Sequence, residues 1–165
     1  MDDIEKRVCE IIMEIGEQGV REGWKSDRIW TETIKKHIGI LGKEKGFYIC
    51  SSGWSYPDGQ GEWLYDLVWL QNEGDYMVSV PLVLECEWGI DIKNIEEDFC
   101  KLLVARAEHR IMIFQQRNQG DVNRILDRLD SAIKKFQYTT PGDRYLLIGL
   151  DWTSPRGISD RLVVA

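Results

Sequence analysis

The chain has 165 residues, of which 43% are hydrophobic and 30% are charged, and its formal net charge is −7. This length corresponds to about one domain, and the balance of apolar and charged residues excludes a disordered chain. The negative net charge argues against a protein that coats nucleic acid nonspecifically, because neutralising phosphates requires lysine and arginine. No apolar run approaches the roughly 20 residues that span a bilayer, so we expect no membrane partner.

The first ten residues, MDDIEKRVCE, are charged and then helical in pattern, unlike a secretory signal. We therefore expect a cytoplasmic protein whose thiols stay reduced. Its four cysteines lack C-x-x-C spacing and have no histidine at ligand spacing, which favours buried free thiols over a structural zinc site.

The first 40 residues predict two helices. Apolar residues recur at helical spacing from Ile4 to Ile15, and the first helix is expected to end near Gly16 and Gly19. The second helix is predicted over residues 26–37, and the next two glycines, at 39 and 42, are expected to break it.

From residue 46 the pattern changes to strands, which are predicted over residues 46–50, 63–70 and 77–88. A turn at 72–75 makes a hairpin of the last two strands, and Pro81 predicts an edge or a bulge. Further elements are then expected: a helix over 91–107, a strand over 110–114, a helix over 121–136, a strand over 145–152 and a short edge strand over 161–164.

This order, ααβββαβαβ with a final edge strand, predicts an α/β fold with a mixed central sheet and helices on both faces. The sequence has no internal repeat, low-complexity tract or long linker. We therefore predict a single domain over residues 1–165, in which the helices of residues 1–40 pack on an α/β core formed by residues 46–165.

Three carboxylates interrupt strands that are otherwise apolar, namely Asp66, Glu85 and Glu87. Strand alternation directs Glu85 and Glu87 to one face, and hairpin pairing brings Asp66 within reach of Glu85. Like charges at this spacing repel one another unless a cation or protonation offsets them. Carboxylates with a backbone carbonyl are ligands that Mg²⁺ or Mn²⁺ favours. The alternative is that these carboxylates are solvated at strand ends or paired with lysine and arginine.

These residues resemble the PD-(D/E)XK nuclease superfamily. That family has an aspartate on its second core strand, (D/E)-x-K on the third, and then a helix and a strand. Here residues 65–68, YDLV, resemble the first element and residues 84–87, LECE, the second, while 95–114 fits the helix and strand. The likeness covers roughly residues 46–114, with the preceding helix and the final αβ unit.

The resemblance implies a restriction-endonuclease-like fold and metal-dependent hydrolysis of phosphodiesters, as an endonuclease or exonuclease using Mg²⁺ or Mn²⁺. It favours DNA over RNA as the nucleic-acid partner. Asp66 and Glu85 would ligate the metal, with the carbonyl of Cys86 as a third ligand. Glu87 stands where the family usually carries lysine, and Lys101 on the following helix is the candidate replacement, with a solvated lysine as the alternative.

Two other sets of residues are weaker candidates. The literal Pro57–Asp58 pair lies in a glycine-rich turn, which makes it a poorer match than Asp66. Several cations are candidates for phosphate contacts or, equally, for solvated faces: Lys35, Lys36, Lys43, Lys45, Arg106, Arg110 and Arg117.

Other functions stay open at this point. The missing strand lysine, the acidic net charge and the small size are also typical of a catalytically inactive nuclease fold that serves as a binding or assembly protein. A third reading is an unrelated α/β domain whose carboxylates bind a small cationic ligand. The small size and the aromatic content predict a homodimer.

Overall fold

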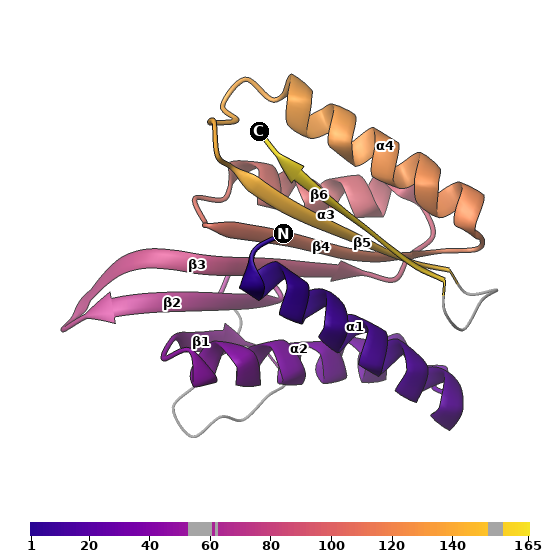
Figure 1. The fold of residues 1–165 in the computed structure, drawn as a ribbon, viewed down its shortest axis with the longest axis horizontal. Helices are drawn as coiled ribbons and strands as arrows, with labels where there is room; N and C mark the ends of the chain where they lie inside the picture. Colours follow the sequence, from indigo (N-terminus) through magenta and orange to yellow (C-terminus); the bar gives the residue numbers. More distant parts are fainter. Residues whose placement is uncertain (53–60, 62, 152–156) are drawn as a thin grey trace.

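The computed structural model describes residues 1–52, 61, 63–151 and 157–165. Within these residues it confirms an α/β fold with four helices and six strands in the predicted order (Figure 1). The elements are α1 (Asp3–Glu22), α2 (Asp27–Glu44), β1 (Tyr48–Ser51), β2 (Leu67–Glu73), β3 (Tyr76–Glu87), α3 (Ile92–Val104), β4 (His109–Gln116), α4 (Gln119–Lys135), β5 (Arg144–Asp151) and β6 (Ile158–Val164).

The six strands form one mixed sheet in the order β1-β2-β3-β4-β5-β6. β1, β2 and β3 are antiparallel neighbours, β3, β4 and β5 are parallel, and β6 returns antiparallel along the edge. Pro81 lies on β3 just before pairing with β4 begins at Leu82, and the β2–β3 register shifts on both sides of Gln71. The expected bulge is therefore present, and Pro81 avoids a ladder position that needs its missing N–H.

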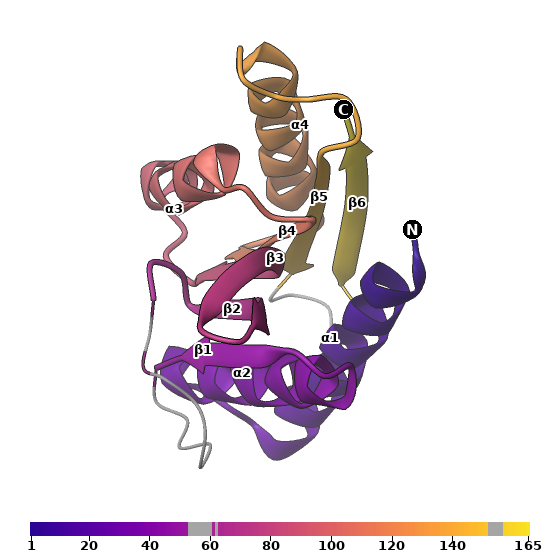
Figure 2. The same cartoon turned by 90° about the vertical axis from the view of Figure 1, so that its left-hand side faces the viewer.

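Helices cover both faces of the sheet, as Figures 1 and 2 show. The apolar faces of α1 and α2 pack on one side, against strand residues such as Trp69, Leu84 and Ile113. The helices α3 and α4 pack on the other side, against Val83 and Phe114 among others. Alternate residues of each strand thus enter two separate cores, which is the pattern expected for a sheet buried on both faces.

Both N-terminal helices continue through the glycines that were expected to end them, so those boundaries were wrong. A Cβ at Gly42 would lie 2.6 Å from side-chain atoms of Ile49 and Trp69, and a Cβ at Gly19 would overlap the ring of Trp30. These glycines serve close packing of the helices rather than chain reversal. The first helix instead ends at Gly23, whose φ of 66° is left-handed.

Other boundaries also differ from the predictions. The predicted strand over 63–70 begins only at Leu67, because Leu64 has a φ of 64° and a tight turn joins Trp63 to Tyr65. Asp66 therefore lies immediately before β2 and not inside it. The helix α3 ends at Val104, three residues earlier than expected, since the backbone at Ala105 is extended. β6 begins at residue 158, three residues earlier than predicted.

The loop at 57–58 and residue 152 lie outside the described residues. Among the helices that are described, none combines the length and the apolar character required to cross a bilayer.

Candidate metal centre

Asp66 is fixed against β3 by its side chain. Its Oδ2 accepts a hydrogen bond of 2.8 Å from the backbone N–H of Cys86, and Ser51 Oγ donates to its carbonyl oxygen at 3.0 Å. The adjoining register pairs Leu67 with Leu84, which puts Asp66 beside Glu85. The structure therefore brings these two carboxylates together as strand pairing predicted, although metal binding by them remains a prediction.

Glu85 lies in the second half of β3 with only 3% of its surface exposed. It faces α3, because Val83, two residues earlier, packs into the α3 side of the sheet. Burial, together with the charge of Asp66, raises the pKa of Glu85 to about 8 against the opposing effect of Lys101. Without a bound cation this carboxyl group therefore tends to hold a proton near neutral pH.

Lys101 extends from α3 toward the same carboxylate. Its Nζ lies 3.2 Å from Glu85 Oε1 and 2.7 Å from Asp98 Oδ1. Glu85 Oε1 is nevertheless buried without a hydrogen bond of good geometry among the described residues, so the contact with Lys101 is electrostatic. Burial lowers the pKa of Lys101, but the hydrogen bond to Asp98 and the charge of Glu85 outweigh it and raise that pKa overall. Lys101 is thus an ammonium ion at this site.

Glu87 follows two residues later and is half-buried. Its Oε1 accepts a hydrogen bond from the backbone N–H of Gly89. Burial raises the pKa of Glu87, the Gly89 hydrogen bond lowers it, and contact with the Asp98 carboxyl group raises it. The net effect is a glutamate that binds a proton more tightly than a surface glutamate does.

Asp98 is a member of this cluster that the sequence analysis missed. It contacts Lys101 and influences Glu87, and its side chain is 21% exposed. A signal was present, since Asp98 precedes Lys101 by three residues and so shares its helix face. An acidic residue at that spacing marks Lys101 as paired rather than simply solvated.

Lys35 is the second missed member, because it was grouped with the phosphate-contacting or solvated cations. The structure buries it to 4% exposure on α2. Its Nζ lies 2.8 Å from Ser52 Oγ and 3.9 Å from Asp66 Oδ1. Helical spacing could have indicated this burial. One buried face of α2 carries residues at i, i+3, i+4 and i+7, namely Lys35, Ile38, Gly39 and Gly42.

We call these residues the acidic centre: Asp66, Glu85, Glu87, Asp98, Lys35 and Lys101. They contain four carboxyl groups and two ammonium groups, so within this set full ionisation gives a net charge of −2. A single divalent cation balances that charge, and carboxylate oxygens suit Mg²⁺ or Mn²⁺. The buried Glu85 Oε1, which lacks a well-formed hydrogen bond, is an oxygen suited to such a ligand role.

The predicted ligand from Cys86 is its backbone carbonyl, and the properties of its thiol do not favour the side chain as an alternative. Burial, reinforced by the charge of Asp66, raises the pKa of the Cys86 thiol well above its ordinary value. A protonated thiol is a poor metal ligand, because metals bind the thiolate. Its side chain also packs on the α1–α2 side of the sheet, away from Glu85. Only the carbonyl oxygen of Cys86 is left as a candidate ligand.

A second acidic group lies elsewhere. Among the described residues, Asp2, Glu5 and His109 are the one set of three or more acidic, histidine or cysteine side chains whose ligand atoms all lie within 4.8 Å of one another. Arg144 donates to both oxygens of Glu5 at 2.8 and 2.7 Å, and His109 Nε2 lies 2.8 Å from Asp2 Oδ2. These charges are already compensated. In the acidic centre the carboxylate oxygens are more widely spaced, so ion binding there requires side chains to move.

No protein-family model, curated protein or solved structure matches this chain. The structure itself shows an α/β fold with a mixed sheet of six strands and the acidic centre beside β3.

Proposed function

We propose that the chain is a metal-dependent phosphodiesterase that acts on nucleic acid, with DNA favoured, and that its fold is of the PD-(D/E)XK kind. The observation that carries this proposal is the contact of Lys101 with Glu85, which supplies a cation from α3 where the strand motif has Glu87 instead of lysine. The pairing of Asp66 with the β3 backbone next to Glu85 supports it.

Asp66, Glu85 and the carbonyl of Cys86 would hold the cation. When bound, Mg²⁺ or Mn²⁺ supplies Lewis-acid activation of a water and charge compensation at the leaving oxygen. Once Glu85 is compensated in this way, the Lys101 ammonium group can contact a phosphate oxygen. Its raised pKa suits it to stabilise negative charge rather than to accept a proton.

Glu87 is the better candidate for the proton acceptor. Its raised pKa makes it a stronger base than a surface glutamate, and it lies two residues from Glu85 on the same face of β3. In this scheme the attacking water passes its proton to Glu87 while Lys101 faces the phosphoryl oxygens. The scheme therefore assigns opposite roles to the carboxylate and the lysine.

The first test is calorimetric titration of Mn²⁺ into the wild type and into Asp66→Ala/Glu85→Ala, followed by cleavage assays on single-stranded, duplex and branched DNA and on RNA. We expect saturable binding in the wild type, loss of binding in the double variant, and metal-dependent cleavage. The control is Glu97→Ala, which removes an exposed carboxylate from the same helix as Lys101. If the folded wild type does not bind Mn²⁺, the catalytic proposal is wrong.

The second candidate is a nuclease fold that binds or assembles without cleaving. The observation that favours it is Glu87 at the position where the resemblance calls for lysine. Metal binding without cleavage of any of these substrates would select this candidate. Binding of small organic cations in place of metal would point to an unrelated α/β domain.

A further inference from the structure

The hairpin of β2 and β3 extends beyond the rest of the sheet (Figure 1). β4 pairs with β3 only over residues 82–87, and β1 pairs with β2 only over 67–70. Residues 71–80, which we call the arm, are therefore a two-stranded ribbon with no further strand beside it among the described residues. One backbone hydrogen bond of 3.0 Å, from Glu108 N–H to the Val80 carbonyl, fastens its base. A two-stranded ribbon alone is marginally stable in water.

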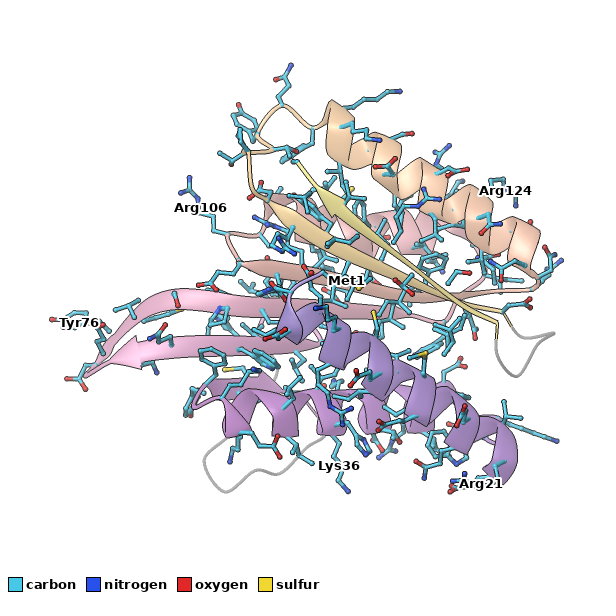
Figure 3. All side chains as sticks on the ribbon, viewed as in Figure 1. Met1, Arg21, Lys36, Tyr76, Arg106 and Arg124 are labelled. Atoms are coloured by element: carbon cyan, nitrogen blue, oxygen red, sulfur yellow. The ribbon has the colours of Figure 1, made fainter. Side chains whose placement is uncertain are left out.

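The arm carries apolar side chains that the protein leaves exposed. Tyr76 is 78% exposed, Met77 51% and Val78 47%. Because successive strand residues point to opposite faces, each face of the arm carries at least one exposed apolar side chain beside polar ones. Figure 3 shows Tyr76 at the outermost point of the hairpin. Contiguous exposed apolar surface on a projecting strand pair is typical of an interaction site.

The base of the arm borders two hollows, of about 720 Å³ and 340 Å³, which share part of their lining. The shared residues include Val80, Val104 and Arg106, and the larger hollow continues to Tyr138. Val104 is 68% exposed and Tyr138 81% exposed. We call this combined surface the groove. Its lining is mixed, because apolar side chains lie beside the charged Arg106 and Glu108. It is open to solvent, and it adjoins the arm, since Met77 and Val78 line the smaller hollow.

Charge distinguishes the possible occupants of the groove. The tip of the arm has two exposed acids, Glu73 and Asp75. Arg106 lines both hollows, projects from the α3–β4 connection toward solvent (Figure 3), and makes no ion pair within the described residues. The other arginine of the groove, Arg110, is already paired with Asp143 at 3.1 Å. The acidic arm repels nucleic acid, whereas an arm from a second copy brings its acids to Arg106.

We infer that two copies of this chain associate by exchanging arms, each arm lying in the groove of the partner across a twofold axis. Arm and groove lie side by side on one face, which is the self-complementary arrangement that a twofold interface requires. Association covers the exposed apolar side chains, gives the arm neighbours, and pairs Arg106 with the acidic tip. This inference does not rest on the proposed phosphodiesterase activity.

Sedimentation velocity over a wide micromolar range tests the inference, with Met77→Asp, Arg106→Glu, Asp75→Arg and the combined charge swap Arg106→Glu/Asp75→Arg. We expect a dimeric wild type, a dissociation constant at least ~10-fold higher for each single variant, and recovery in the charge swap. Lys36→Glu is the matched control, because it makes the same charge change as Arg106→Glu on α2, away from the arm (Figure 3).

Asp75, Met77 and Arg106 lie on the arm or in the groove, and the control position, Lys36, lies on α2. All four side chains are exposed, so the far-ultraviolet circular dichroism spectrum of each variant should match that of the wild type. A monomeric wild type overturns the inference. A dimer that none of the arm and groove variants weakens also overturns it, since the interface then lies elsewhere. If Lys36→Glu weakens the dimer as much as the arm and groove variants do, the inference is likewise overturned.

Discussion

Lys101 Nζ lies 3.2 Å from Glu85 Oε1, so the lysine on α3 and the glutamate on β3 share one site although 16 positions separate them in the sequence. This contact places a cation beside the strand motif that lacks its own lysine. A metal ion bound as we propose would compete with Lys101 for this carboxylate. The lysine is therefore expected to weaken metal binding while supporting chemistry.

The first prediction follows from that competition. Lys101→Met should bind Mn²⁺ several-fold more tightly than the wild type, because it removes a positive charge next to the ion. The same variant should lose about 100-fold or more in cleavage rate, because in the proposed mechanism the Lys101 ammonium group faces the phosphoryl oxygens. Calorimetry and single-turnover cleavage measure the two effects separately.

Lys93→Met on the same helix is the control and should change neither quantity, since Lys93 is exposed. Equal losses of metal affinity and activity in Lys101→Met would contradict the assignment, because they would indicate that the lysine builds the site rather than competing for it.

The second prediction concerns pH and the metal-free protein. The pKa of Glu85 is about 8 when folded, chiefly through burial, and about 4.3 in an unfolded chain. Between these values the folded state binds more protons than the unfolded state, so stability falls as pH rises from about 4.3 to about 8. Glu85→Gln lacks this penalty and should be more stable than the wild type by ~2 kcal/mol at pH 9, with a smaller difference at pH 5.

Urea unfolding with chelator present measures this difference. Added Mn²⁺ should reverse the order at high pH, because only the wild type gains stability from binding, and its affinity should rise as Glu85 loses its proton. A stability difference that stays constant from pH 5 to 9 would show that Glu85 does not titrate in this range.

Much of the fold follows from periodicity and turn chemistry. Apolar side chains recur every three or four residues in the helical segments and every two residues in the strand segments. This change in spacing along the chain predicts the ααβββαβαβ order that the structure shows. The turn between β2 and β3 was also predictable, because Gly74 supplies its left-handed conformation with a φ of 58°. The errors in the two N-terminal helices lie at glycines, since the sequence does not show whether a glycine ends a helix or admits a neighbouring ring, as Gly19 does for Trp30.

The acidic centre was predictable only in part. Asp66, Glu85 and Glu87 are conspicuous as charges in apolar strands, and antiparallel pairing brings Asp66 next to Glu85. Lys35 approaches from the opposite side of the sheet, and Asp98 comes from a helix. Lys35 and Asp98 reach the acidic centre because of how α2 and α3 pack on the two faces of the sheet. The spacing of apolar residues along the sequence does not predict that packing.

A third prediction tests the role of Lys35. Replacing it by methionine removes the ammonium group 3.9 Å from Asp66 while keeping an apolar side chain in the buried space. We expect a loss of roughly 1–2 kcal/mol in stability, below that for a fully buried pair because Asp66 is 21% exposed. Metal affinity should increase, since one positive charge near Asp66 is removed.

Lys36→Met is the matched control for this variant, because Lys36 is the next residue on α2 and is exposed. Its stability should change by less than about 0.5 kcal/mol. Chemical unfolding and Mn²⁺ titration of both variants measure the contrast, and equal behaviour would show that Lys35 contributes nothing to the acidic centre.

The last prediction concerns the glycines inside α1. In an exposed helix, replacing glycine by alanine stabilises by up to about 1 kcal/mol. At Gly19 the added Cβ would overlap the rigid indole ring of Trp30, whereas at Gly16 it meets only the flexible end of Ile158 at 3.0 Å. Gly19→Ala should therefore destabilise the protein by roughly 1–3 kcal/mol, because the ring must shift in a close-packed core.

Gly16→Ala should be near neutral, which makes it the internal control for helix propensity on the same element. Thermal unfolding and tryptophan fluorescence measure the effect, since a displaced Trp30 changes its emission when it moves from its packed position beside Trp24 and Trp88. If Gly19→Ala were instead the more stable variant, with unchanged fluorescence, Gly19 would be a replaceable helix residue. The contact between α1 and α2 would then tolerate a larger separation than the structure shows.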